Sequence, residues 1–254
     1  MPFGVVMLLS SGFYLWSRVV ERILANRAAF VADELDDHPR YGALLEGWPI
    51  IVGAAALALP LAFIDRRLIW PPLLFAGAAA AFFRDPRRTL APDPDCLYSA
   101  ADGFILDVDE VDEPWFLGGR ALWIITFLSI FDVHVNRSPL AGTLVKTHHI
   151  DGGYAPAMDR AGAELNERQL LAIEGARGPI VVVQIAGLLA RRIRRWVEPG
   201  AVLRAGQKFG MIKFGSRTDV IIPLGQAEAL VTKGARVRAG ITPIARYRTA
   251  TPGA

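Results

Sequence analysis

The segment GAVLRAG at residues 200–206 recurs as GARVRAG at residues 234–240, 34 positions later. We call these segments the first and second glycine repeats. A looser pair precedes them, in which SAADG at 99–103 resembles SPLAG at 138–142. Glycines at both ends of a short segment favour tight turns around a short strand, and their recurrence indicates a duplicated β unit. Paired glycine turns that flank short strands resemble the lipoyl-carrier type of β-sandwich, so we expect a lipoyl-carrier-like β-sandwich with duplicated hairpin motifs; a chance similarity of turns in an all-β protein is the alternative.

Short runs of β-branched and apolar residues surround these repeats. Examples are residues 121–127, 180–185 and 219–222, each close to glycine or proline. Such runs are typical of strands. We therefore predict that residues 89–254 form a mainly β domain.

Two longer apolar runs precede this region, at residues 48–64 and 68–83, and only Asp65, Arg66 and Arg67 separate them. At about 1.5 Å per residue each run reaches roughly 25 Å as a helix, slightly less than a hydrocarbon core of about 30 Å. We predict a hydrophobic helical hairpin at 48–83 within an N-terminal α-helical, membrane-associated region, residues 1–88. Full crossing, shallow insertion and a buried helix pair of a soluble protein remain open.

Composition supports a membrane location and limits the partners. Hydrophobic residues make up 52% of the chain, and the mean hydropathy is +0.31. The net charge of +3 and the isoelectric point of about 9.2 favour anionic partners. The basic residues lack interleaved aromatics apart from Trp196, so we expect no nucleic-acid partner. A single cysteine, Cys96, excludes an intrachain disulfide.

The segment KFGSRTD at residues 213–219 carries the candidate chemistry, between the strand-like runs 209–212 and 219–222. Glycine before a serine can adopt backbone angles closed to other residues, which exposes its carbonyl to the serine hydroxyl. Attack by Ser216 on the carbonyl of Gly215 would convert the amide to an ester, and elimination with loss of ammonia would leave a pyruvoyl group. The dipeptide alone is a common turn.

Several segments occur in the order typical of phosphatidylserine decarboxylase proenzymes. They are Glu46-Gly-Trp-Pro49, Phe82-Phe-Arg-Asp-Pro86, Ala101-Asp-Gly103, Asp132-Val-His-Val-Asn-Arg-Ser-Pro-Leu-Ala-Gly142, Asn166-Glu-Arg168, Val183-Gln-Ile-Ala-Gly187 and Phe214-Gly-Ser216. The chain most resembles the short bacterial and archaeal form of that family, from about residue 46 to residue 248.

The resemblance implies a self-cleaving, pyruvoyl-dependent carboxy-lyase that converts phosphatidylserine to phosphatidylethanolamine and carbon dioxide through a Schiff base. Cleavage between Gly215 and Ser216 would give a β chain of residues 1–215 and an α chain of residues 216–254. The implied catalytic residues are Asp102, His134 and Ser216, with His134 as the base and Asp102 orienting it. The pyruvoyl group made from Ser216 would be the cofactor, and no metal is implied.

One position departs from the longer family members, which carry a second histidine where this chain has Arg137. His134 would then serve both cleavage and turnover, with His148 and His149 as alternatives. Lys213, Arg217 and Arg137 are candidates to bind the substrate carboxylate or phosphate. The basic run 191–195 is a candidate for contact with anionic headgroups, and a solvated charged strand is the alternative.

The expected partners are phosphatidylserine, an anionic membrane surface and a homo-oligomer of the chain. The basic residues that flank the hairpin suggest the inner membrane, with the catalytic domain on the cytoplasmic side. Two readings compete. One keeps the chemistry but changes the lipid, for example to an archaetidylserine. The other is a membrane-tethered carrier domain, but Lys146, Lys208, Lys213 and Lys233 lie in no recognisable attachment signature.

Overall fold

The computed structural model describes residues 42–89, 92–188, 192–213 and 216–248. The helical elements are α2 (Ala43–Ile64), the 3-10 turn η1 (Arg66–Ile69), α3 (Trp70–Phe82) and the short α4 (Arg160–Ala163). The strands are β1 (Cys96–Tyr98), β2 (Gly103–Glu113), β3 (Gly119–Leu128), β4 (Val135–Arg137), β5 (Gly142–Ile150), β6 (Arg168–Gly175), β7 (Gly178–Ile185), β8 (Ile193–Arg195), β9 (Val202–Leu203), β10 (Lys208–Ile212), β11 (Ser216–Pro223), β12 (Ala227–Ala229), β13 (Arg236–Val237) and β14 (Pro243–Tyr247).

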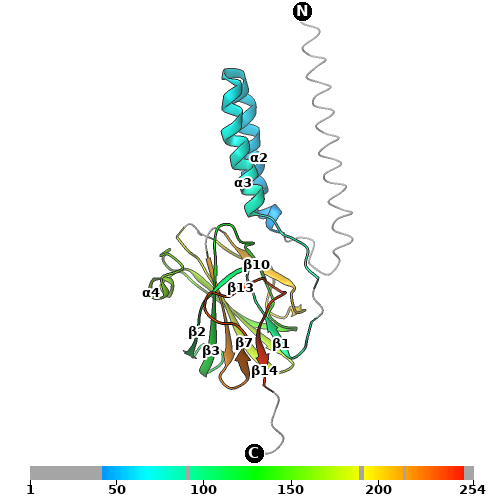
Figure 1. The fold of residues 1–254 in the computed structure, drawn as a ribbon, viewed down its shortest axis with the longest axis vertical. Helices are drawn as coiled ribbons and strands as arrows, with labels where there is room; N and C mark the ends of the chain where they lie inside the picture. The colour runs from blue at the N-terminus through cyan, green and yellow to red at the C-terminus, as the bar shows by residue number, and fades with distance from the viewer. Residues whose placement is uncertain (1–41, 90–91, 189–191, 214–215, 249–254) are drawn as a thin grey trace, which may run out of the picture. The chain divides into compact units, whose positions relative to one another are not determined.

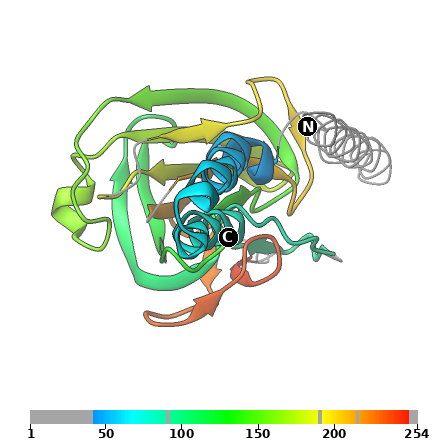
Figure 2. The same ribbon diagram turned by 90° about the horizontal axis from the view of Figure 1, so that it is seen from above.

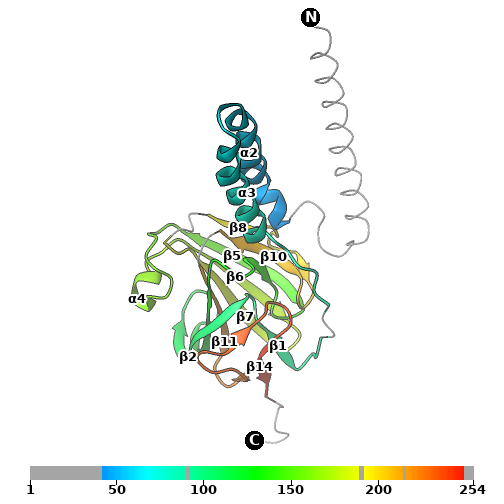
Figure 3. The same cartoon turned by 45° about the horizontal axis from the view of Figure 1, so that its top comes forward.

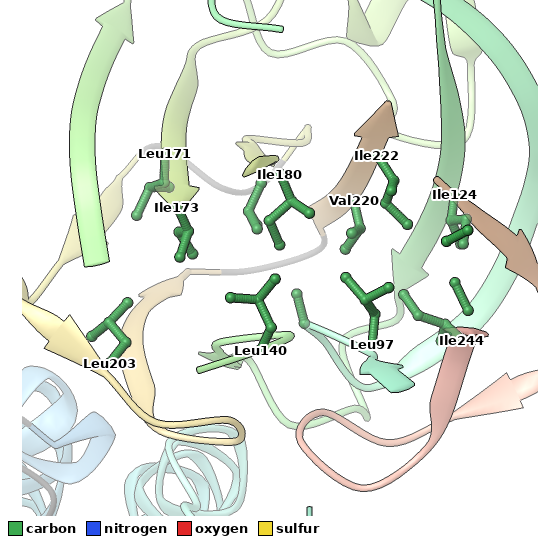
Figure 4. Packing of buried hydrophobic residues seen from close by; sticks show 14 of the residues in the cluster. Leu97, Ile124, Leu140, Leu171, Ile173, Ile180, Leu203, Val220, Ile222 and Ile244 are labelled. Carbon is green, nitrogen blue, oxygen red and sulfur yellow. The ribbon is translucent and has the colours of Figure 1, made fainter. Parts of the chain in front are cut away.

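An antiparallel sheet of eight strands, in the order β13-β2-β3-β11-β7-β6-β5-β9, curls around the core (Figures 1 and 2). Two three-stranded sheets, β1-β14-β12 and β4-β10-β8, complete the domain. Figure 4 shows the packing between these layers, with Leu97 and Ile244 facing Val220 and Ile124. The predicted mainly β domain is confirmed.

The two glycine repeats adopt matching structures at opposite edges of the large sheet. The first contains edge strand β9 and the second contains edge strand β13. In each repeat the first glycine amide bonds the main sheet, at 2.7 Å to the Leu144 carbonyl and at 2.8 Å to the Ile105 carbonyl. The last glycine amides bond the carbonyls of Ser138 and Ser99, at 2.9 and 2.8 Å. All four glycines have positive φ, between 66° and 94°, which favours glycine there. Equivalent bonding in both copies supports duplication over chance similarity.

The predicted helical hairpin is present as α2 and α3, joined by η1. The Asp65 carboxylate accepts the Arg67 amide at 2.8 Å and so closes the connection. Pro71 and Pro72 open α3, where the missing amide hydrogens cost no helical hydrogen bond. By length and composition α2 can cross a membrane, and Phe63 is 91% exposed near its end. Its apolar surface is therefore available to lipid.

The base of the hairpin packs on the β domain beside β8 and β10 (Figure 3). Phe82 and Phe83 belong to one buried cluster with Val135 and Met211. A Cβ at Gly47 would lie 2.3 Å from the Phe83 ring, so glycine is required for this close approach. Residues Gly42–Ala254 form one compact unit that contains the hairpin and the strands, and the boundary expected at residue 88 stays a prediction.

Candidate active site

Ser216 opens β11, which lies in the middle of the large sheet between β3 and β7. It pairs with Leu128, the last residue of β3. The side chain has no exposed surface, and its hydroxyl makes no hydrogen bond in the part of the chain that is described. A buried polar group without a partner is uncommon and is often associated with catalysis. This hydroxyl is therefore the first candidate nucleophile.

The side chains of β11 alternate between two environments. Ser216 and Thr218 lie on the face whose later members, Val220 and Ile222, enter the main core. Thr218 accepts a hydrogen bond at 3.0 Å from the Asn136 amide nitrogen. This face of the strand therefore carries a polar stretch at its start and an apolar stretch at its end.

Asn136 is the centre of a buried polar network on the same face. Its side-chain nitrogen also donates to the Ala100 carbonyl at 3.3 Å, and its oxygen accepts from Gln184 at 2.8 Å. Gln184 is on β7 and pairs with Thr218 of β11. The network fixes β4, β7 and β11 against one another next to Ser216, because each member loses a buried hydrogen bond if it moves.

Arg217 points to the opposite face and is completely buried. Its guanidinium donates to both carboxylate oxygens of Asp219, at 2.8 and 2.7 Å, and lies 5.0 Å from the Trp123 ring centroid. Trp123 also donates from its indole nitrogen to Asp219 at 2.8 Å. Arg217 therefore anchors β11 on the face of the sheet opposite to the Ser216 side chain.

His134 lies at the same end of the sheet, immediately before β4. Its carbonyl accepts the amide of Ile212 at 3.2 Å, and Ile212 precedes Ser216 by four residues. Four residues span at most about 14 Å, so Ile212, which is bonded to His134, lies within that distance of Ser216. The His134 ring is fully buried and lies 4.3 Å from the Phe82 ring, centroid to centroid.

The protonation state of His134 follows from its surroundings. Nδ1 lies 2.9 Å from the Asp132 carbonyl, which can only accept, so Nδ1 carries the proton and Nε2 keeps its lone pair. Burial lowers the pKa of His134 to about 4, although the Asp132 hydrogen bond and the charges of Asp132 and Asp102 oppose this change. At neutral pH the ring is therefore an uncharged base.

A tight turn at residues 129–132 holds the Asp132 carbonyl in place. The Ser129 amide and hydroxyl donate to the Asp132 carboxylate at 2.9 and 2.6 Å, and the Asp132 amide returns a bond to the Ser129 carbonyl at 2.9 Å. The turn follows Leu128 directly, so it begins across from Ser216. Arg84, which follows α3, donates to the Phe131 carbonyl and connects the turn to the hairpin.

Asp102 forms a part-buried ion pair with Arg88, whose two terminal nitrogens lie 2.5 and 2.6 Å from the carboxylate oxygens. The Ala239 amide adds a third bond at 2.8 Å. The next residue, Gly103, has a φ of 151°, and a Cβ there would lie 1.9 Å from the Phe127 carbonyl oxygen. Asp102 thus occupies a rigid turn, and its charge acts on His134 through space.

Lys213 and Arg137 are also held by other groups of the protein, a side chain for Lys213 and a backbone carbonyl for Arg137. The Lys213 ammonium lies 2.8 Å from the Glu46 carboxylate of α2 and 5.8 Å from the Phe83 ring centroid. Arg137 donates to the Gly206 carbonyl at 2.9 Å. Gly215, the other half of the expected cleavage site, lies outside the described residues, as does Arg191 of the basic run.

The alternative histidines lie on β5, away from Ser216. His149 pairs in register with Gln169, then Gln184, then Thr218, so three strand spacings separate it from β11. At about 4.8 Å each, these spacings amount to roughly 14 Å. Among the described residues, no group of three or more His, Cys, Asp or Glu side chains is arranged to hold a metal ion. Among these three histidines, His134 is the one that follows the turn opposite Ser216 and bonds to Ile212, four residues before Ser216.

Sequence reasoning assigned no role to three residues that shape this site. Phe82 covers the imidazole, Arg88 neutralises Asp102, and Asn136 organises the buried network. All three lie in or beside quoted segments of the sequence, and a double aromatic at the end of a hydrophobic hairpin was the available signal. Their partners are distant in sequence, so the pattern alone did not reveal the contacts.

Comparison with known proteins gives a consistent result. The family model for phosphatidylserine decarboxylase matches residues 75–245. The chain is similar to the phosphatidylserine decarboxylase proenzyme of Carboxydothermus hydrogenoformans, with 47% identity over 203 residues, which is 80% of this chain and 95% of that protein. The phosphatidylserine decarboxylase proenzyme of Symbiobacterium thermophilum is 44% identical, and the alignment covers 79% of this chain and 94% of that protein. The phosphatidylserine decarboxylase proenzyme of Desulfotalea psychrophila is 40% identical, and the alignment covers 80% of this chain and 96% of that protein. This chain therefore belongs to the phosphatidylserine decarboxylase family, because the family model matches more than half of the chain and the relatives align with it over nearly all of their own length.

Proposed function

We propose that this chain is a phosphatidylserine decarboxylase proenzyme that cleaves its own backbone between Gly215 and Ser216. The observation that carries the proposal is the buried Ser216 hydroxyl without a hydrogen-bond partner, at the same end of the sheet as the neutral imidazole of His134. A nucleophile and a base near each other in a site closed to water favour attack on the adjacent carbonyl over hydrolysis.

In the first step, His134 Nε2 takes the proton of the Ser216 hydroxyl as its oxygen attacks the Gly215 carbonyl carbon. The imidazolium returns this proton to the Ser216 nitrogen as the C–N bond of the peptide breaks, and an ester forms. Loss of the Ser216 Cα proton then expels the carboxylate of residue 215, and water replaces the remaining nitrogen, which leaves as ammonia. Residue 216 ends as a pyruvoyl group with a ketone next to an amide.

The fold supports the product as well as the precursor. Strand β11 is hydrogen-bonded to β3 over its whole length and to β7 over residues 217–221. The Arg217–Asp219 pair fixes its first residues from behind. The 39-residue α chain would therefore stay in the sheet after scission, with its new end still beside His134.

The residues at the end of β11 fit a pyruvoyl group. The space now filled by the unpartnered Ser216 hydroxyl is the position that the ketone would occupy, next to the Asn136–Thr218 bond. When formed, such a group would supply an electrophilic ketone for the serine amine of the substrate and would accept the electrons released as carbon dioxide leaves. His134 Nε2 can hold a water whose proton replaces the carboxylate on the product.

The three residues that were candidates for substrate binding have different roles in this proposal. Lys213 lies three residues before Ser216, and its ammonium can exchange Glu46 for a substrate carboxylate or phosphate. Arg217 and Arg137 are better described as positioning residues, because they already bind Asp219 and Gly206. Asp102 acts with Arg88 to hold the turn near β4, and its negative charge favours a transient imidazolium on His134.

We further propose that α2 and α3 associate with the cytoplasmic side of the inner membrane. The apolar surface of α2 and the basic residues that flank the hairpin in the sequence, such as Arg40, Arg84 and Arg87, support this placement. A membrane-bound enzyme would meet phosphatidylserine in the layer where the lipid resides. The lipid tails, and an archaetidylserine as a substrate, can be compared by measuring carbon dioxide release from each lipid.

The decisive variant is Ser216→Ala. It is expected to remain one chain of 27.7 kDa and to release no carbon dioxide, whereas the wild type yields two chains. Ser99→Ala is the matched control, because Ser99 is also completely buried but lies outside β11. It should still be cleaved. Cleavage of Ser216→Ala at the same bond would contradict the proposal.

A further inference from the structure

Exposed apolar side chains gather at the end of the large sheet where Ser216 begins β11. Ile130 and Phe131, in the turn that follows β3, are 47% and 79% exposed. Leu188 follows β7, and Leu165 lies shortly before β6; both are strongly exposed. The register of Ser216 with Leu128 places these segments at one end of the sheet, since Ile185 of β7 pairs with both Arg217 and Arg168.

The turn at 129–132 is both apolar at its tip and tied to the catalytic base at its root. Its tip exposes Ile130 and Phe131, whereas its root supplies the Asp132 carbonyl that binds His134 Nδ1. A hydrogen-bonded turn of this kind would normally expose polar residues. Two large apolar residues at this tip therefore indicate an interaction with another molecule that removes them from water.

The residues around the tip indicate what kind of surface it contacts. Arg84 donates one hydrogen bond to Ala81 of α3 and another to the Phe131 carbonyl, so the tip is continuous with the base of the apolar hairpin. Arg236 reaches the Asp132 carboxylate at 3.4 Å while its own side chain remains 69% exposed. Apolar side chains with cations beside them match the boundary between acyl chains and anionic headgroups.

We propose that Ile130 and Phe131 insert into the phospholipid bilayer beside the α2–α3 hairpin and form a lipid-contacting wedge at the entrance to the catalytic site. This inference rests on the proposed function, because it requires a lipid substrate in the same bilayer. A headgroup must leave the lipid layer to reach the buried end of β11. A wedge that begins two residues after Leu128, the partner of Ser216, shortens that path.

The test compares Phe131→Asp with Leu224→Asp in fully processed enzyme. Leu224 is an exposed residue in the turn at the other end of β11, roughly 26 Å from Ser216 along the strand. Carbon dioxide release is measured with vesicles of phosphatidylserine and phosphatidylcholine, and with a short-chain phosphatidylserine kept below its micelle concentration. The ratio of vesicle rate to short-chain rate should fall about tenfold in Phe131→Asp and stay at the wild-type value in Leu224→Asp.

A direct binding measurement accompanies the rates. Phe131→Cys and Leu224→Cys, each in a Cys96→Ser background, carry an environment-sensitive dye. Vesicles should shift the emission of the dye at residue 131 to the blue and leave the dye at residue 224 unchanged. An unchanged emission at residue 131, or an unchanged rate ratio in Phe131→Asp, would overturn the wedge. A wild type that releases no carbon dioxide from either substrate would instead overturn the proposed function, and the wedge with it.

Discussion

Replacing Phe82 by alanine should change the pH range over which the chain cleaves itself. The Phe82 ring lies 4.3 Å from the His134 ring and helps to keep water away from it. Burial lowers the pKa of His134 from 6.5 to about 4. Removal of the phenyl ring admits water, which hydrates the imidazolium and raises the pKa back toward 6.5.

The size of the effect follows from the two protonation equilibria. The change in pKa from 6.5 to about 4 corresponds to a penalty of roughly 3 kcal/mol on the charged ring. If the smaller side chain restores about one pKa unit, or roughly 1.4 kcal/mol, about half of the His134 rings are charged near pH 5, against about a tenth in the wild type. Because only the neutral ring can accept the serine proton, cleavage should fail at a higher pH in the variant.

The assay follows fresh precursor from cell-free synthesis after transfer to buffers between about pH 4.5 and pH 8. Gel densitometry gives the cleavage rate, and the ratio of the rate near pH 5 to that near pH 7.5 is compared between proteins. Phe116→Ala is the control, because Phe116 contacts Trp115 in the turn between β2 and β3, at the other end of those strands. A wild-type midpoint near 6.5, or an identical ratio in Phe82→Ala, would refute the reasoning.

Three further results are expected. Arg88→Met leaves the part-buried Asp102 carboxylate without its cation and should lower the free energy of unfolding by about 3 kcal/mol, the low end for a buried pair, seen as a lower Tm. Arg217→Lys loses the two-point contact with Asp219 and should cost about 1 to 3 kcal/mol in urea unfolding. Stability should also fall between about pH 6.5 and pH 4, by up to roughly 3 kcal/mol, because the unfolded chain protonates His134 at a pH where the folded chain does not; His134→Gln should lack this slope.

Controls for these results come from the same chain. Arg120→Met breaks an exposed pair with Glu110 and should change stability by less than about 1 kcal/mol. A loss in Arg88→Met no larger than in Arg120→Met would mean that the Asp102 pair is not a buried electrostatic anchor. An unchanged urea midpoint in Arg217→Lys would show that the bidentate contact with Asp219 is not needed for stability. If stability still falls between about pH 6.5 and pH 4 in His134→Gln, a residue other than His134 causes the pH dependence.

Apolar runs and glycine repeats in the sequence allowed the main features of the fold to be predicted. The apolar runs at 48–64 and 68–83 gave the helical hairpin, and the two glycine repeats gave equivalent turns at the two sheet edges. The strand after the candidate cleavage site was predicted too short. It begins at Ser216, whereas the apolar run in the sequence begins only after Asp219 and Arg217 was a candidate substrate ligand.

That boundary explains why the role of Arg217 was difficult to predict. In a strand that begins at Ser216, the next side chain necessarily points to the other face. The contacts of Asp102 and His134 were unpredictable for a different reason. Arg88 and Phe82 reach them across the fold from the end of the hairpin, and only three-dimensional packing brings these residues together.

The central claim is that residue 216 becomes an electrophile by breaking its own peptide bond. Intact-mass analysis of purified, active protein tests it most directly. The account predicts a chain of residues 1–215 and a chain of residues 216–254 whose first residue is lighter than serine by one ammonia and reacts with a ketone reagent. Active protein that retains an uncleaved chain of 27.7 kDa with an unmodified Ser216 would contradict it.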